Sequence, residues 1–500
     1  MKRNLQDYRL LQMNRARIGI GVLLAVGAFL LFFQGMAGRG LVGPDEPRYA
    51  SIAREMQESG DWVTPRLDGE PWFEKPALLY WLGAASGALG LGDDRATRWP
   101  VALISVIFLA FFFCQVSRQF GSPAAGCSTL ILATSAGWAA YSQVGIFDLP
   151  LAASVGAALL VLLPWVERSD EKTRKALPWF GLLLGISVLA KGLVGPAIAA
   201  LALLSVCVQR GLRPVLRDLF HPRVLLPFVA VVLPWYALCY AANGNVFVEE
   251  FFWRHHVERF TSDSIEHVKP FWYFLAVLPA GLLPWTPLLA LTPDSEQRHD
   301  PRMQFLLTWI LTTLLLFSVS RNKLPSYVLP LFPALAIWMS VSLVRVRSPR
   351  YVLLAAAALL ALVPVAEAIL PKAISRGLSN AWPPSNVSWL GVGVMLATAA
   401  AVWWASSRNR TLLAVGLLAA GTAGGLACLK LNTFAAIDRE AGTRELWRQV
   451  ETHLDETCIG QVRRHVAYGL AYYSHGRLPS CESSPRPFRV DSDPAVFSGP

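Results

Sequence analysis

Residues 43–81 read GPDEPRYASIAREMQESGDWVTPRLDGEPWFEKPALLYW and concentrate charge in a chain that is otherwise strongly apolar. The stretch begins with Asp45 and Glu46, and it carries Glu74 and Lys75 close to its end. Between these charges, four less polar side chains recur with the spacing of one helix face: Tyr49, Ile52, Ala53 and Met56. The pattern predicts an amphipathic helix that starts near Asp45, within a polar loop between apolar segments.

The apolar segments themselves indicate a membrane protein. Of the 500 residues, 54% are hydrophobic and only 16% are charged. We count about thirteen apolar segments of roughly 20 residues, the length that crosses a bilayer as a helix. The net charge is +11, but the basic residues stand in short loops between these segments, which is typical of membrane proteins and unlike a nucleic-acid-binding patch. We therefore expect an all-α, polytopic protein that contacts the lipid bilayer and binds no nucleic acid.

The basic loops also predict the orientation. The segment from Ile18 to Met36 is long enough to span and lacks a clear cleavage site, so we interpret it as the first span, preceded by a basic cytoplasmic N-terminus. Thirteen crossings then place the loop 37–96 and the C-terminus outside the cytoplasm. This result depends on the two apolar segments on either side of Lys191. If they formed a single span, every later loop would lie on the opposite side of the membrane.

The sequence predicts two domains. Residues 1–429 form the transmembrane domain, including the first external loop with its amphipathic helices, and residues 430–500 form a small extracytoplasmic α/β domain. Because this tail is short for an independent core, we expect it to rest on the membrane domain. Cys458 and Cys481 are the two cysteines in the tail. Thiols outside the cytoplasm can oxidise, and the sequence leaves open whether these two form a disulfide.

Several charged residues on the external side are candidates for chemistry, and each also has a purely structural interpretation. Asp45 could start a helix, Glu74 and Lys75 could form a surface ion pair, and Asp148 could be a solvated span end. The cluster Arg254–Arg259 could likewise be solvated, and the cations Lys191, Arg321 and Lys323 could be anchor residues at the membrane surface. Taken together, however, carboxylates, imidazoles and cations on one membrane face fit an anionic substrate and a divalent metal ion.

Several motifs in the first two thirds of the chain resemble one family. DEPRYASIAREM and the following GDWVTPRLDGEPWFEKPALLYWL are similar to the first periplasmic loop of the bacterial aminoarabinose transferases that act on lipid A. The other matching segments are FDLPLAA (147–153), WRHHVERF (253–260), PFWYFLAVLPAGLLPW (270–285) and SRNKLPSYVLPLFPALA (320–336). These transferases have the GT-C fold and are related to protein O-mannosyltransferases.

The resemblance implies a glycosyltransferase of the bacterial inner membrane. Such an enzyme takes a sugar, aminoarabinose or a related one, from undecaprenyl phosphate and attaches it to lipid A on the periplasmic side, with inversion. The family's thirteen spans and external C-terminal domain agree with the count above. The basic N-terminal segment is expected in the cytoplasm, as inferred above, and we expect the protein to act as a monomer.

The resemblance assigns roles to single residues. Asp45 matches the acidic catalytic position and Asp148 a second acidic position, while Lys75 matches a contact to the carrier phosphate. Glu74 and His256 match residues associated with a divalent, zinc-like metal. A phosphate-facing role is also expected at Arg48, Arg259, Lys323 and Tyr327.

Two departures from the family pattern affect these expectations. His255 stands where related enzymes have an acidic residue, so the metal shell is expected to differ. Beyond Val344 no family motif is found, so the acceptor is not fixed by the motifs. A protein hydroxyl or another glycan is the alternative acceptor. A secondary transporter is the alternative class, but it would place ionisable residues near the bilayer midplane and not at one face.

Overall fold

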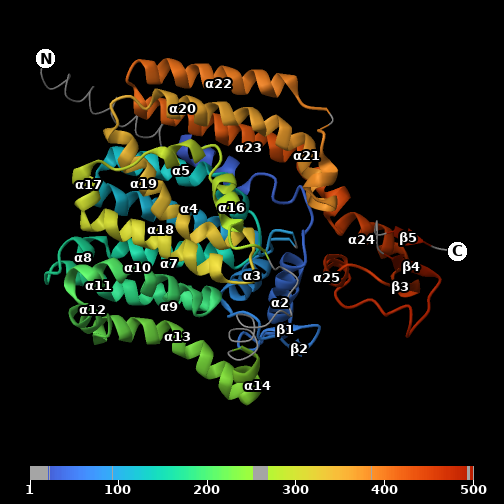
Figure 1. Cartoon of the computed structure of the whole chain (residues 1–500). Coiled ribbons are helices and arrows are strands. Elements are labelled where there is room, and N and C mark those ends of the chain that lie inside the picture. Colours follow the sequence, from blue (N-terminus) through green and yellow to red (C-terminus); the bar gives the residue numbers. More distant parts are fainter. Residues whose placement is uncertain are drawn as a thin grey trace, which may run out of the picture.

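The computed structural model describes residues 21, 23–92, 94–251, 269–384, 386–491 and 496–498, and helices dominate it (Figure 1). The helices of the N-terminal half are α2 (Asp45–Ser59), α3 (Leu78–Ala88), α4 (Arg98–Phe120), α5 (Ser122–Thr134), α6 (Ala136–Tyr141), α7 (Asp148–Val161), α8 (Leu163–Glu167), α9 (Leu177–Lys191), α10 (Val194–Ala202), α11 (Leu204–Arg210), α12 (Leu212–Leu219), α13 (Pro222–Asn243) and α14 (Asn245–Val248).

The C-terminal half contains α16 (Tyr273–Gly281), α17 (Ser295–His299), α18 (Pro301–Val319), the 3₁₀ segment η5 (Pro325–Leu331), α19 (Phe332–Arg345), α20 (Arg350–Ala358), α21 (Leu362–Arg376), α22 (Trp389–Ser407), α23 (Thr411–Ala441), α24 (Arg444–Val450) and α25 (Arg464–Tyr473). The strands are β1 (Arg66–Leu67), β2 (Glu70–Pro71), β3 (Thr457–Ile459), β4 (Phe488–Asp491) and β5 (Val496–Ser498).

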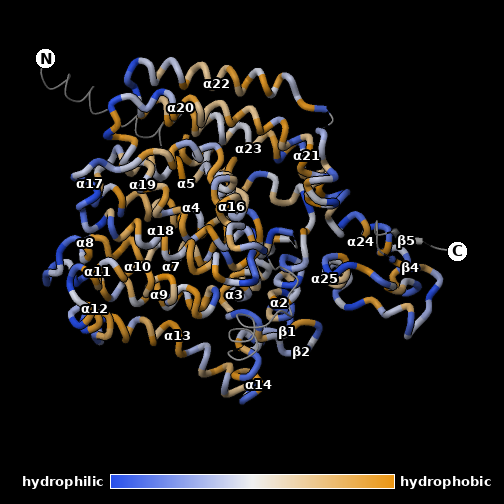
Figure 2. Tube along the Cα trace, in the orientation of Figure 1, coloured by the Kyte–Doolittle hydropathy of each residue, from blue (hydrophilic) through white to orange (hydrophobic). Residues whose placement is uncertain are grey.

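Long apolar helices confirm a multi-pass membrane protein. Within the described ranges, seven helices are long and apolar enough to cross a bilayer: 94–120, 222–243, 301–319, 325–345, 350–376, 389–407 and 411–441. Shorter apolar helices cover 23–33, 148–161 and 194–210. Figure 2 shows that this helical body is predominantly hydrophobic, whereas the first loop and the C-terminal segment carry more hydrophilic residues. The total of thirteen crossings stays a prediction.

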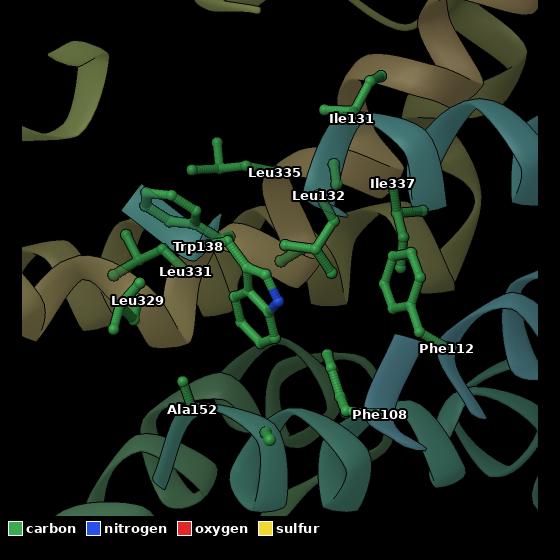
Figure 3. Close-up of a cluster of buried hydrophobic side chains, with 14 of the residues drawn as sticks. Phe108, Phe112, Ile131, Leu132, Trp138, Ala152, Leu329, Leu331, Leu335 and Ile337 are labelled. Carbon is green, nitrogen blue, oxygen red and sulfur yellow. The ribbon is translucent and has the colours of Figure 1, made fainter. Parts of the chain in front are cut away.

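Helix α7 lies at the centre of this body. Its sequence DLPLAASVGAALLV is apolar on every face apart from Asp148 and Ser154, and all its residues are buried. A helix with no polar face needs partners all around it, and α7 packs against α4, α9, α10 and η5. Figure 3 shows the neighbouring part of the core, where the Trp138 side chain lies among residues from several helices.

Helices α9 and α10 form a hairpin, as expected for two separate segments around Lys191. Helix α9 ends at Lys191, and Gly192 has φ of 68°, which favours glycine. Beyond the turn, Gly195 lies so close to the Ser187 side chain that a Cβ atom would overlap it. The turn therefore returns the chain along α9 and leaves Lys191 at the end of the hairpin.

The first loop contains the predicted amphipathic helix. Helix α2 spans Asp45–Ser59 and ends at Gly60, which has the left-handed conformation common at helix C-termini. The predicted face is buried, because Tyr49, Ile52, Ala53 and Met56 are all at most 4% exposed. After α2, the short antiparallel hairpin of β1 and β2 turns at Asp68 and Gly69, which both have positive φ. The chain then reaches α3.

A buried ion pair joins this loop to the helical body. Glu46 and Arg98 are 1% and 0% exposed, and the guanidinium donates from Nε to Oε1 (2.6 Å) and from Nη2 to Oε2 (2.7 Å). The amides of Val42 and Gly145 also donate to this carboxylate. The carboxylate is therefore fully hydrogen-bonded, which is what a charge in this position requires.

One helix crosses the boundary predicted between the two domains. Helix α23 continues from Thr411 to Ala441 without interruption, so the boundary drawn between Leu429 and Lys430 falls inside a helix. The physical reason is that a helix does not have to end where a membrane ends, since its backbone hydrogen bonds continue into water. Lys430 is itself buried and donates to the carbonyl oxygens of Leu30 and Leu31. The division into two domains stays a prediction.

Beyond Gly442 the chain forms α24, α25 and a small mixed sheet. Strand β4 pairs with β3 in parallel and with β5 in antiparallel orientation. A disulfide joins Cys458 and Cys481, which resolves the alternative that the sequence left open. Helix α25 packs on α2, and the Tyr473 hydroxyl donates to Asp94 (2.6 Å) and accepts from the Leu41 amide. The tail therefore rests on the first loop, as expected.

Candidate active site

Two carboxylates of the first loop share one guanidinium. Asp45 is in the first turn of α2, where the positive end of the helix stabilises an anion. Arg48, one turn later, contacts Asp45 Oδ1 through Nη2 at 2.6 Å, and the same nitrogen contacts Glu74 Oε2 at 3.1 Å. Burial by itself would lower the pKa of Arg48, but Glu74, Tyr49 and Asp45 outweigh this effect and raise it. Arg48 therefore stays charged between the two acids.

Glu74 and Lys75 lie in the bend between β2 and α3. The Lys75 ammonium donates to Glu74 Oε1 at 2.8 Å, so the two oxygens of Glu74 face two different cations. The following Pro76 disfavours a helical conformation at Lys75 and delays the start of α3. The local sequence thus keeps both charged side chains on a loop, beside the start of α2.

A second ion pair is built by helix ends in the body of the protein. Asp148 is the first residue of the central helix α7, and Lys191 is the last residue of α9. Their side chains meet at 2.7 Å between Nζ and Oδ1. The Lys191 ammonium also lies 4.8 Å from the centre of the Tyr327 ring on η5, within range of a cation–π interaction. Three separate elements therefore meet at this ammonium.

A cavity of about 410 Å³ connects the two ion pairs. Its polar lining contains Asp45, Glu74, Lys75, Asp148, Lys191, Ser320, Asn322, Ser326 and Tyr327, with Tyr49 and Pro76 beside them. Its apolar lining contains Phe147, Leu151, Leu193, Val194, Ala197, Leu316, Phe317, Leu324 and Pro330. Such a lining suits a ligand that has both a charged group and a hydrocarbon part, because the charged group can contact the polar residues and the hydrocarbon part the apolar ones.

Comparison with known proteins identifies relatives of this chain. The family model described as dolichyl-phosphate-mannose-protein mannosyltransferase matches residues 74–237, which include Glu74, Lys75, Asp148 and Lys191. The undecaprenyl phosphate-alpha-4-amino-4-deoxy-L-arabinose arabinosyl transferase of Serratia proteamaculans is 32% identical over 333 residues, covering 64% of this chain and 58% of the relative. A second arabinosyl transferase, from Pseudomonas fluorescens, is 29% identical over 486 residues, covering 90% and 82%.

The solved structures agree with these relatives. ArnT from Cupriavidus metallidurans bound to undecaprenyl phosphate matches with a TM-score of 0.77 and 28% identity, over 92% of this chain and 85% of that one. The chain is related to the aminoarabinose transferases. An archaeal oligosaccharyltransferase from Archaeoglobus fulgidus shares the fold more distantly, with a TM-score of 0.50 and 14% identity. The chain spans less than two thirds of the length of several aminoarabinose transferases that it matches, for example 58% of the Serratia protein.

Five of the seven described residues to which the resemblance assigned a role meet at the cavity. Asp45, Asp148, Glu74, Lys75 and Tyr327 all line it, although they come from three distant parts of the sequence. Arg48 is not in the lining: only 13% of its side chain is exposed, and it contacts Asp45 and Glu74 from behind. In this structure Arg48 contacts the two carboxylates, and its expected phosphate-facing role stays a prediction.

One other expected residue, Lys323, lies away from the cavity wall, and two more fall outside the described residues. Lys323 is buried, lies outside the lining, and donates to the carbonyl oxygens of Lys269 and Ser320. Because Lys323 follows an apolar segment, the sequence predicted that its charge would face the site. In the structure its ammonium group donates to backbone carbonyl oxygens instead. His256 and Arg259 lie outside the described residues, so their expected roles stay predictions.

The described residues do not by themselves form a metal shell. No group of three or more His, Cys, Asp or Glu side chains suited to a metal occurs among them. Both oxygens of Glu74 contact cationic side chains, which compete with a metal ion for the same lone pairs. The divalent, zinc-like ion at Glu74 and His256 therefore stays a prediction, and no chemical step below depends on it.

Lys191 lines the cavity, although the family resemblance assigned it no role. Its sequence signal was a basic residue at the end of an apolar segment, followed by Gly192. An anchor at the membrane surface gives the same signal. Only the hairpin of α9 and α10 and the position of α7 show that the ammonium faces the cavity.

Proposed function

We propose that this protein is a glycosyltransferase that moves a sugar, aminoarabinose or a related one, from undecaprenyl phosphate to lipid A. The observation that carries the proposal is the cavity, in which two lysines and three carboxylates stand beside an apolar wall. A polyprenyl phosphate has an anionic head, which the lysines can bind, and a hydrocarbon chain, which the apolar wall can contact. The names of the relatives, which act on or bind undecaprenyl phosphate, support the same substrate class.

The leaving group of this transfer is a polyprenyl phosphate. Breaking the bond between the sugar and the phosphate oxygen increases the negative charge on the phosphate, and that charge needs stabilisation more than protonation. Lys75 and Lys191 both line the cavity and offer ammonium groups that are held in place before the reaction. Preorganised positive charge of this kind is usually a large contribution to catalysis.

Asp45 is the residue best placed to act on the acceptor. Its side chain is 41% exposed, whereas the side chains of Glu74 and Asp148 are 8% and 10% exposed. A partly exposed carboxylate at the cavity can orient an incoming acceptor, or take a proton from it when the acceptor is a hydroxyl. A phosphate of lipid A is already nucleophilic and requires positioning more than deprotonation. We propose a single displacement with inversion.

The membrane arrangement is part of the proposal. Thirteen crossings, a cytoplasmic N-terminus and a periplasmic C-terminal α/β domain in the inner membrane would place the cavity on the periplasmic side. The basic loops support this orientation. The seven long apolar helices, and the hairpin that separates the segments around Lys191, support the crossing count. We also propose that the protein acts as a monomer.

The replacement Asp45→Asn tests the assignment of the acid. We expect transfer to lipid A in proteoliposomes to be lost, while binding of undecaprenyl phosphate is retained. Glu70→Gln is the matched control, because Glu70 is an exposed acid of the same loop that lies outside the cavity lining, and it should transfer like the unmodified protein. Turnover by Asp45→Asn at the unmodified rate would contradict the role of Asp45.

A protein hydroxyl is the second candidate acceptor. The match of residues 74–237 to the protein mannosyltransferase model favours it specifically. Mass spectrometry of lipid A and of periplasmic proteins, with and without this protein, separates the two acceptors. Modified protein together with unmodified lipid A would replace the first proposal by the second.

A further inference from the structure

Arg48 is surrounded by three aromatic rings, and one of them comes from the far end of the chain. The guanidinium carbon lies 5.2 Å from the ring centre of Tyr49, 5.5 Å from Trp72 and 5.6 Å from Tyr468. Distances below about 6 Å are those of cation–π interactions. Tyr49 and Trp72 belong to the same loop as Arg48, whereas Tyr468 lies on α25 in the C-terminal segment.

The position of Arg48 determines the position of two carboxylates at the cavity. Its Nη2 atom contacts both Asp45 Oδ1 and Glu74 Oε2. Because one nitrogen serves both acids, a rotation of the guanidinium would change both contacts at once. Asp45 and Glu74 line the cavity, while Arg48 stands behind them. Whatever holds the guanidinium therefore also influences the separation of the two acids, together with Lys75, which contacts Glu74.

We infer that Tyr468 is a positioning residue of the active site, which holds Arg48 and through it the carboxylates of Asp45 and Glu74. The tyrosine is half-buried and packs against the main hydrophobic core, so its ring is itself held in place. The C-terminal segment then contributes to catalysis although none of its described residues lines the cavity. The inference rests on the proposed function, because its effect is measured on transfer.

The same interface offers a matched control. Arg54, on the same helix as Arg48, stands 4.5 Å from the ring centre of Tyr472 and donates from Nη1 to the Tyr472 carbonyl oxygen at 2.6 Å. This second pair also attaches α25 to α2. Arg54 does not line the cavity, and its ion pair is with Glu58, away from Asp45 and Glu74. Loosening this pair weakens the docking of the tail without acting on Arg48.

The test compares Tyr468→Leu, Tyr468→Phe, Tyr468→Trp and Arg54→Leu in the full-length protein, in proteoliposomes with the lipid-linked donor and lipid A. Rates are divided by the amount of folded protein. For Tyr468→Leu we expect kcat to fall roughly fivefold, the size of a lost cation–π contact, with little change in KM for the donor. Phe and Trp keep an aromatic face and should restore kcat. Arg54→Leu should lower thermal stability and leave kcat unchanged.

Three results would overturn the inference while the proposed function stands: an unchanged kcat in Tyr468→Leu, an equal loss of kcat in Tyr468→Phe, or an equal loss in Arg54→Leu. The last result would mean that the tail acts only by its general docking. Absence of transfer by the unmodified protein is a different outcome, which would remove the proposed function and this inference together.

Discussion

At the residue scale, two adjacent acids of the first loop have opposite surroundings. Asp45 is partly exposed at the cavity, whereas Glu46 is buried and hydrogen-bonded to Arg98 and to two backbone amides. Consecutive residues of a helix point in different directions, so one can face the substrate while the next faces the core. Asp45 is therefore available for the proposed reaction, whereas Glu46 stabilises the fold.

Replacing Glu46 should destabilise the protein strongly. The change Glu46→Gln leaves the Arg98 guanidinium buried beside a neutral partner, and breaking a buried ion pair in this way costs roughly 3 kcal/mol or more. Thermal unfolding in detergent at neutral pH measures the loss. Glu58→Gln is the control, since Glu58 is an exposed acid on the same helix. An equal midpoint temperature for Glu46→Gln and the unmodified protein would contradict the prediction.

The same variant gives a pH prediction. Burial by itself would raise the pKa of Glu46, but Arg98 and Arg39 outweigh it and lower the pKa from 4.5 to about 2. A carboxylate with a depressed pKa contributes its stability fully above its ordinary pKa and loses it as the pH falls toward the depressed value. The stability difference between the unmodified protein and Glu46→Gln should therefore shrink between pH 4.5 and pH 2. A difference that stays constant across this window would contradict it.

At the scale of elements, glycines allow the helices of the body to approach one another. Gly181 of α9 lies against the backbone of α13, where a Cβ atom would overlap the Val224 carbonyl oxygen. Gly185, one turn later, lies beside Phe228 and Val231 of the same helix. Small residues permit this close packing between membrane helices, where van der Waals contact is a main source of stability. The contact fixes α9, and with it Lys191 at its end.

The variant Gly181→Ala should therefore lower stability by roughly 1–3 kcal/mol, the usual cost of overpacking, because α9 and α13 would have to separate. Since Lys191 would then move away from Asp148, transfer should fall as well. Gly393→Ala in α22 is the matched control: a Cβ atom there meets nothing within 4 Å. Thermal unfolding and transfer assays of both variants provide the measurement. Equal behaviour of the two variants would contradict the packing argument.

At the scale of the whole molecule, the C-terminal segment connects parts that are far apart in the sequence. The disulfide between Cys458 and Cys481 closes a loop with a sequence separation of 23 within the tail. Arg444, the first residue of α24, contacts Asp438 of α23 and Asp94 near the end of the first loop. Arg444 thus attaches the tail to α23 and to the first loop, and α25 attaches it to α2. A periplasmic location would allow the disulfide to persist.

This arrangement predicts the behaviour of the two tail cysteines in intact bacterial spheroplasts. A membrane-impermeant thiol reagent should label Cys458 and Cys481 only after reduction. The variant Cys481→Ser should lower the stability of the tail by roughly 3 kcal/mol in the loop-entropy model. Labelling of Cys458 before reduction would contradict the disulfide. Absence of labelling after reduction would contradict the periplasmic location, with solubilised protein as the control for access.

The sequence by itself determined the membrane class, the amphipathic helix after Asp45 and the family resemblance. Helical periodicity, apolar length and local motifs are properties of neighbouring residues, so they can be read along the chain. It also selected Asp45, Glu74, Lys75, Asp148 and Tyr327, which the structure brings to one cavity. Their roles in transfer stay with the proposed function.

Only the tertiary structure decided which charges face the cavity. Lys191 and Lys323 both follow apolar segments, yet one lines the cavity and the other donates to backbone carbonyls. Arg48 stands behind two acids and contacts Tyr468, a residue of the distant tail. The physical reason is that the direction of a charged side chain depends on the packing of helices that are remote in sequence. No local pattern carries that information.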